Sequence, residues 1–306
     1  MLSYPFVSPQ TNNVFADSSK AVVLANPIQD EAGQLRISLL PGLIDTAHRN
    51  LSRGLTNLAI FEYGAVFIAA TSKPPVFPET SARPSAEQLA NLELGIPDQP
   101  KHLAGLFLGL RVGSQPGSKS VASGVKDALE AARVVGSAVG VALEVRQAQP
   151  KGLHSGRSGE LLVGGVVVGV VGELNPSVSK SHDLPRTVGV FEINLDTLFA
   201  VAPFAVTAKP IGTFPAATQD LSLIVGADTP AADVLRAVRE GAGVLLEEIS
   251  LTDDYRGANL PEDLKSLTFA LRFRAMDRTL TQSEASDARD AGVQVARERF
   301  GAEIRS

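Results

Sequence analysis

The chain has 306 residues, of which 44% are hydrophobic and 20% charged, with a formal net charge of −5. This composition is typical of globular proteins and excludes a disordered chain, and no apolar run approaches the roughly 20 residues of a membrane-spanning helix. The absence of cysteine excludes disulfides, thiolate zinc sites and thiol catalysis, and with no visible secretory signal we expect a cytoplasmic location.

The first part of the chain predicts two extended segments that flank one helix. Segment 21–27 is apolar and closes with the turn signal Asn-Pro, which favours a short strand. Within 35–54, apolar residues recur at helical spacing, and Ser38 is a candidate N-cap. Segment 58–68 predicts a strand, in which Gly64 indicates a bulge or a close backbone approach.

The middle of the chain predicts a loop, several strands and a second helix. Residues 71–88 are rich in proline and polar side chains, which predicts an exposed loop. The glycine- and serine-rich connector 113–120 precedes a helix with one apolar face. Two prolines and a lack of periodicity in 200–213 predict a domain boundary. The strands expected here are 102–110, two strands joined at Gly164-Gly165 within 159–174, and 187–195.

The remaining stretch predicts a complete small module. Its order is strand, helix, two strands, helix and strand, the ferredoxin-like split pattern with both helices on one face of the sheet. Thr229-Pro230 supplies an N-cap and a first-turn proline for a helix to about residue 248, and Thr281 and Glu284 have capping-box spacing for the second helix. The strands are expected at 220–226, 249–257, 265–275 and 302–306.

Alternation in the third of these strands separates a helix-covered face from an open polar face. Open four-stranded sheets are a common platform for single-stranded RNA, and arginines two residues apart can stack on bases or clamp phosphates. An ordinary solvated sheet face is the alternative, and the usual RNA-recognition aromatics are not evident on these strands. The candidate RNA-contacting residues are Ser222, Ser250, Thr252, Thr268, Arg272 and Arg274.

The charge is unevenly distributed between the two parts of the chain. Residues 1–209 carry 17 Lys+Arg and 17 Asp+Glu, whereas residues 210–306 carry 11 and 16. An acidic module does not attract polyanions by bulk charge, so indiscriminate binding to nucleic acid is excluded. Any RNA partner must be held by a local face.

A series of short motifs, in order along essentially the whole chain, resembles the C-terminal part of the bacterial phenylalanyl-tRNA synthetase beta subunit. The motifs are "YPFVSP", "NPI…LRISLLPGLI", "RNLSRG", "IFEYGAVF", "LHSGRSGEL", "VGELNPSV", "FPAATQDLSLIV", "DDYRG…KSLTFALRF" and "RTLT". The resemblance implies an α+β protein with two domains. Residues 1–209 are expected to form a class II synthetase-like antiparallel sheet with helices, and residues 210–306 a ferredoxin-like βαββαβ anticodon-binding domain. Because the motifs begin part-way along the family pattern, we expect that an N-terminal part is missing.

The same resemblance implies that the first domain is not catalytic. A class II active site needs an arginine beside the glutamate that holds ATP, yet Phe61 and Ile60 precede Glu62 and no arginine follows Glu173. Without a guanidinium, charge developing on the α-phosphate has no clamp. We therefore expect no catalytic residue, and the four scattered histidines predict no metal site.

The resemblance also implies partners. The holoenzyme attaches phenylalanine to tRNA(Phe) with ATP and magnesium as an alpha2–beta2 assembly, and this chain alone is expected to need no cofactor and to be inactive. Its first domain is expected to pack against the catalytic alpha subunit, and its second to bind the anticodon region. Since class II dimers use the helix–strand unit at 38–68, the candidate interface residues are Leu39, Leu43, Ala47, Leu51 and Phe61.

Two other hypotheses stay open. A paralogue that binds a protein partner and no RNA is supported by the acidic module and by Gln219, where the family usually has a basic residue before the aspartate. An independent α+β enzyme rests only on the glycine-rich strands at 159–174, which fit no dinucleotide-binding fingerprint.

Overall fold

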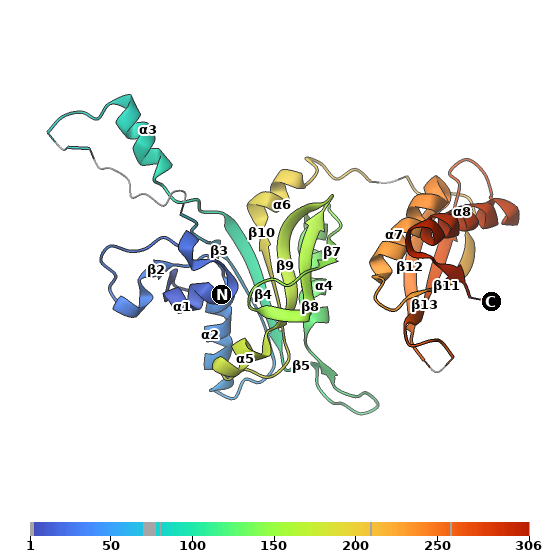
Figure 1. The fold of residues 1–306 in the computed structure, drawn as a ribbon, viewed down its shortest axis with the longest axis horizontal. Coiled ribbons are helices and arrows are strands. Elements are labelled where there is room, and N and C mark those ends of the chain that lie inside the picture. Colours follow the sequence, from blue (N-terminus) through green and yellow to red (C-terminus); the bar gives the residue numbers. More distant parts are fainter. Residues whose placement is uncertain (1–2, 70–77, 80, 209, 258, 306) are drawn as a thin grey trace. The chain divides into compact units, whose positions relative to one another are not determined.

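The structure is a computed structural model that describes residues 3–69, 78–79, 81–208, 210–257 and 259–305 (Figure 1). The chain forms two compact units, Met1–Val206 and Thr207–Ser306, each built around its own sheet. The domain boundary predicted within residues 200–213, with domains of residues 1–209 and 210–306, stays a prediction. In the part of the chain described, no helix has the length and apolar character needed to cross a bilayer.

The first unit is built on a six-stranded, fully antiparallel sheet with the order β3-β4-β10-β9-β8-β7. The predicted hairpin is confirmed, because β8 and β9 are joined by Gly164 and Gly165 with φ of +55° and +85°. Both glycines adopt the left-handed conformation that a two-residue turn between twisted strands requires. The strands are β3 (Leu58–Ala65), β4 (Lys101–Leu108), β7 (Glu144–Gln147), β8 (Leu153–Val163), β9 (Val166–Leu174) and β10 (Val188–Asn194).

Helices cover both faces of this sheet. On one face, α2 (Leu40–Leu51) packs on the even-numbered residues of β4 and β10; on the other, α4 (Val125–Ala138) and α6 (Leu195–Val201) pack on the odd-numbered residues. The alternation of each strand thus feeds two separate cores. The shorter elements are β1 (Phe6–Val7), α1 (Pro9–Phe15), η1 (Ser18–Lys20), η2 (Asp30–Ala32), β2 (Gln34–Leu35), α3 (Ala86–Leu94), β5 (Leu110–Val112), β6 (Val121–Ala122) and α5 (Pro176–Ser181).

The second unit has the ferredoxin-like order β12-β13-β11-β14, with both helices on one face. Its core joins the sheet residues Leu223, Leu267 and Phe269 to Val238 and Ala296 of the two helices. The fold class predicted from the sequence is therefore confirmed. The elements are β11 (Ala217–Gly226), α7 (Ala231–Ala242), η3 (Gly243–Leu245), β12 (Leu246–Tyr255), β13 (Leu264–Phe273), α8 (Gln282–Phe300) and β14 (Glu303–Ile304).

Several local predictions are corrected by the structure. Segment 21–27 is not a strand, since it contributes only single bridges, from Ala21 to Ile68 and from Val23 to Gln34. The N-cap of α2 is Leu39 rather than Ser38. Helix α7 has Pro230 as its N-cap and ends at Ala242, with η3 following, so it stops before residue 248.

The predictions for two loops and for Gly64 can also be compared with the structure. Part of the loop predicted at 71–88, residues 71–77 and 80, lies outside the described residues, and its other end enters the short helix α3, which the sequence did not predict. The connector 113–120 joins β5 to β6 before the helix α4 begins. Gly64 makes no bulge, because β3 pairs with β4 in unbroken register from Leu58 to Ala65.

Candidate functional site

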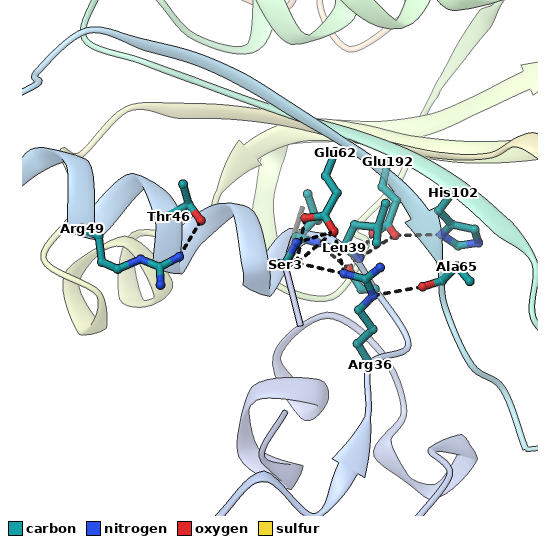
Figure 2. A network of polar contacts seen from close by, with 11 residues as sticks. Ser3, Arg36, Leu39, Thr46, Arg49, Glu62, Ala65, His102 and Glu192 are labelled. Atoms are coloured by element: carbon teal, nitrogen blue, oxygen red, sulfur yellow. Dashed lines mark hydrogen bonds and ion pairs between the residues drawn. The ribbon is translucent and has the colours of Figure 1, made fainter. Parts of the chain in front are cut away.

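A buried ion pair involves Glu62, the glutamate beside which the sequence analysis found no arginine to hold ATP. Strand β3 presents Glu62, which is fully buried, and the Nη1 of Arg36 lies 2.7 Å from its Oε1 (Figure 2). The hydroxyl of Ser3 donates to the same carboxylate at 2.8–2.9 Å, and Arg36 Nε donates to the carbonyl of Ala65 at 3.0 Å. Gly64 makes this possible, since a Cβ there would lie 2.5 Å from Nη2 of Arg36. The charge of Glu62 is thus balanced within the chain.

A second carboxylate in the same row of the sheet anchors the start of α2. Glu192 lies across β4 from Glu62, since both residues pair with Ala104. Its oxygens accept hydrogen bonds from the Ser38 hydroxyl at 2.6 Å and from the Leu39 amide at 2.9 Å, and His102 Nδ1 lies 2.8 Å away (Figure 2). A carboxylate at a helix N-terminus interacts favourably with the helix dipole. Glu192 therefore fixes where α2 begins.

These residues do not fit ATP and magnesium. A guanidinium does reach Glu62, but it comes from Arg36 and forms a closed internal pair. The two oxygens of Glu173 accept from Arg157 at 2.8 Å each, which also raises the pKa of that guanidinium. Among the described residues, no group of three or more His, Asp or Glu side chains could hold a metal ion.

The open face of the second sheet brings most of the predicted RNA-contacting residues together. Ser222 on β11 lies opposite Thr268 on β13, and their hydroxyls are 2.9 Å apart. The hydroxyl of Thr252 donates to the Thr268 carbonyl at 3.0 Å, and Ser250 lies opposite Ala270. The packed helices lie on the other face, so these hydroxyls form a polar row across three strands.

The two predicted arginines share one carboxylate. Glu247 accepts from Arg272 Nε at 2.6 Å and from Arg274 Nε at 2.9 Å, and the hydrogen bond from Arg272 is the main reason that the pKa of Glu247 is lowered. Arg274 also donates to the carbonyls of Gly212 and Phe214, and its side chain is only 12% exposed, against 45% for Arg272. Arg274 is thus mainly occupied within the chain, and Arg272 is the more exposed cation.

An aromatic side chain that the sequence analysis missed lies on the same open face. Tyr255 of β12 pairs with Ser266, one of the even-numbered residues of β13 that point away from the helices. The guanidinium of Arg305 lies over the Tyr255 ring, 5.1 Å from its centroid. Ser266 is fully buried, and its hydroxyl has no hydrogen-bond partner among the described residues. This corner therefore combines a stacking surface with an unsatisfied hydroxyl.

Comparison with known proteins decides the family. The family model for the phenylalanyl tRNA synthetase beta chain CLM domain matches residues 1–195, and the model for the ferredoxin-fold anticodon binding domain matches residues 212–305. This chain belongs to the phenylalanyl-tRNA synthetase beta chain family. The resemblance carried by its sequence motifs is thereby confirmed.

Relatives of this family match the chain from end to end. The phenylalanine–tRNA ligase beta subunit of Leifsonia xyli is 53% identical over 313 residues, and that of Thermobifida fusca is 42% identical over 317 residues. Both alignments cover 100% of this chain but only 37% and 38% of the relative, so the chain spans little more than a third of their length. Among solved structures, a pyrrolysyl tRNA synthetase of Desulfitobacterium hafniense aligns with 66% of this chain and 59% of its own, at 12% identity and a TM-score of 0.43.

Within this beta-chain fold, three of the five predicted interface residues are internal. Leu39, Leu43 and Ala47 are fully buried in the core beneath α2, so they have no side-chain surface to offer another subunit. Leu51 is half-buried, and only Phe61, on the edge strand β3, is well exposed, at 62%. The amphipathic pattern of α2 reflects burial within its own unit.

The departure from the family pattern at Gln219 also falls on the covered side. Gln219 precedes Asp220 on β11, and its Nε2 donates to the Ser286 hydroxyl of α8 at 3.1 Å. Strand alternation therefore directs it toward the helices and away from the open face. Because Gln219 points away from the open face, having glutamine instead of a basic residue at this position removes no cation from that face.

Proposed function

We propose that this chain acts in the cytoplasm as a noncatalytic part of phenylalanine–tRNA ligase. Its second unit would hold the anticodon region of tRNA(Phe) on the open face of the sheet. Membership of the beta-chain family supports this proposal, and the observation that carries it is the Tyr255–Arg305 pair on a face free of packed helices. Unpaired loop bases need flat partners of this kind, because their faces are available for stacking.

The chemistry of this corner suits bases better than phosphates. A base stacked on an aromatic ring gains about 1–3 kcal/mol, and Arg305 can stack on a second base. The hydroxyls of Ser222 and Thr268 can each donate or accept a hydrogen bond at a base edge. Binding through base faces and edges is what an anticodon loop with splayed bases permits.

Carboxylates on the same face support this distinction. Asp220, Glu248 and Asp253 occupy open-face positions of β11 and β12, as the register with β13 indicates. They repel a phosphate backbone, so counterion release would contribute little to affinity. We therefore propose that recognition depends on loop bases and only weakly on the salt concentration.

The first unit would pack against the catalytic alpha subunit in an alpha2–beta2 assembly. Support comes from β3, an edge strand whose Phe61 and Tyr63 are exposed. Aromatic side chains are enriched at protein interfaces, and an edge strand can extend a sheet into a partner. ATP and magnesium would be bound by the alpha subunit, because the carboxylates of this unit are engaged internally.

Titration of labelled tRNA(Phe) transcript with the purified chain tests the RNA proposal. We expect Tyr255→Leu to weaken binding about tenfold, since the stacking surface is lost, and Tyr255→Phe to bind like the wild type. Tyr63→Leu, an exposed tyrosine of the other unit, is the matched control and should leave binding unchanged. A transcript with a replaced anticodon loop should bind the wild type and Tyr255→Leu equally. Equal binding of tRNA(Phe) by these two proteins would contradict the proposal.

A protein-interaction module without RNA binding is the second candidate. The carboxylates of the open face favour it, because they oppose any polyanion. It predicts that the wild-type chain does not bind the transcript even at low salt. The noncatalytic assignment has its own test, since phenylalanine-dependent pyrophosphate exchange by the purified chain would overturn it.

A further inference from the structure

Helix α3 (Ala86–Leu94) lies in the connection between β3 and β4 and is formed without burial. None of its nine residues is buried, although it carries several leucines. Its ends are well specified: the Ser85 hydroxyl accepts from the Gln88 amide at 3.2 Å, the Gln88 side chain accepts from the Ser85 amide at 2.8 Å, and Gly95 is the C-cap. The helix is thus specified by its local sequence rather than by a core.

Local caps alone do not make a nine-residue helix stable. Helices shorter than about 12–15 residues are marginal in water, because nucleation is costly and few hydrogen bonds follow it. Most helices in proteins gain their stability by burying an apolar face. Helix α3 lacks that contribution among the described residues, so the burial would have to come from a surface outside them, and a partner subunit is the candidate for that surface.

The side chains of α3 indicate what kind of partner fits. Leu89 and Leu92 are three residues apart and share one side of the helix, and Ile96 continues the spacing just beyond its end. Leu89 and Ile96 are exposed, and Leu94 is 69% exposed. The charged residues of the helix are Glu87 and Glu93, and it contains no basic residue. The complementary surface is an apolar groove bordered by lysine or arginine.

The position of α3 in the fold indicates which partner would carry such a groove. The connection carrying α3 leaves the sheet after Ala65 and returns at Lys101, two residues that pair with each other at one end of β3 and β4. Strand β3 is also the edge strand that exposes Phe61 and Tyr63, the residues proposed to face the alpha subunit. Helix α3 is therefore attached to the same edge of the sheet as the proposed interface.

We propose that α3 is a docking helix that binds an apolar, basic-rimmed groove on the alpha subunit. This inference rests on the proposed function, because it assumes that the alpha subunit is the partner. The binding mode is a short amphipathic helix in a groove, anchored by leucines one turn apart. An acidic helix is a poor ligand for RNA or an anionic membrane, since both repel carboxylates.

Affinity of the full 306-residue chain for its cognate alpha subunit, measured by calorimetry, tests this inference. Leu89→Gln/Leu92→Gln should weaken binding about tenfold or more, since buried apolar anchors dominate interfaces. Glutamine has nearly the helix propensity of leucine, so the helix itself is retained. The matched control is Ala90→Gln/Asn91→Gln, two exposed positions on the other side of the same helix, which should bind like the wild type. Hydrogen exchange should show new protection at residues 89–94 in the complex.

A charge variant tests the basic rim separately. Glu87→Lys/Glu93→Lys should weaken the complex at low salt, and the difference should shrink as salt is raised. If the wild-type chain forms no complex with the alpha subunit, the partner assignment in the proposed function fails, and the docking role fails with it. If the complex forms but the leucine variant binds equally and exchange at 89–94 is unchanged, only the docking role is overturned. Self-association of the chain that the leucine variant abolishes would assign the groove to a second copy and also overturn it.

Discussion

The guanidinium of Arg36 and the carboxylate of Glu62 form an ion pair of 2.7 Å inside the first unit, with side-chain exposures of 8% and 0%. Arg36 lies in the segment before α2, and Glu62 lies on the edge strand β3. Along the chain, α2 and the turn that follows it separate these two segments. Burial of both charges is tolerated because each is balanced and hydrogen-bonded, with Ser3 and Ala65 supplying further partners. The pair therefore ties the start of the helix to the edge of the sheet (Figure 2).

Breaking this pair from one side should be strongly destabilising. Arg36→Met leaves Glu62 as a buried charge whose remaining hydrogen-bond donor among the described residues is Ser3, and we expect the unfolding free energy of the first unit to fall by about 3–5 kcal/mol. Urea unfolding followed by circular dichroism measures this change. The double variant Arg36→Met/Glu62→Met should be more stable than Arg36→Met alone, because no uncompensated charge remains. A loss below about 1 kcal/mol in the single variant would show that the pair is not structurally important.

A methyl group at Gly64 should displace the same guanidinium. The Cβ of an alanine there would lie 2.5 Å from Arg36 Nη2, and the side chain is held at its other nitrogens by Ala65 and Glu62. We expect Gly64→Ala to cost about 1–3 kcal/mol in thermal or urea unfolding. Gly113→Ala is the matched control, since nothing lies within 4 Å of its added Cβ and its φ is not positive. That variant should be neutral or slightly stabilising.

Removing the carboxylate shared by two arginines should strengthen tRNA binding. Glu247→Gln frees Arg272, while Arg274 keeps its contacts with the carbonyls of Gly212 and Phe214. We expect the affinity for tRNA(Phe) at low salt to rise about threefold, and the salt dependence to steepen by up to about one ion. Glu240→Gln breaks the ion pair with Arg299 between the helices α7 and α8, and it should leave binding unchanged. Weaker binding by Glu247→Gln would show that the carboxylate itself contacts the RNA.

Much of the second unit was predictable because its signals are local. The capping box of Thr281 and Glu284 and the alternation of Leu267, Phe269 and Leu271 each depend on residues close together in the chain. Two predicted helices, with predicted strands before and after each of them, are enough to indicate the ferredoxin-like order. The RNA-contacting role of the open-face residues and the interface role of Phe61 stay predictions.

The features that could not be predicted from the sequence depend on contacts between distant segments. Strict alternation from Ile249 would direct Tyr255 toward the helices, but an irregularity between Leu251 and Asp253 shifts the register and turns Tyr255 to the open face. Such a bulge has no clear sequence signal in this strand. In the first unit, the apolar stripe of α2 indicated burial correctly, yet periodicity cannot distinguish burial in its own core from burial by a partner subunit.

The start of α8 should make the second unit sensitive to acid. The Thr281 amide, above all, and then Arg278 donate hydrogen bonds to Glu284 and lower its pKa from 4.5 to about 2. In the unfolded chain the carboxyl regains its ordinary pKa, so the native state binds fewer protons between these two values. The stabilisation from Glu284 is therefore complete above pH 4.5 and is lost as the pH falls toward 2. NMR titration should place the carboxyl midpoint near 2, and urea unfolding should show a smaller decline in stability over this range for Glu284→Gln than for the wild type. Glu298→Gln, on the same helix but far from its N-terminus, should follow the wild type; a decline that Glu284→Gln leaves unchanged would show that other carboxylates control the acid response.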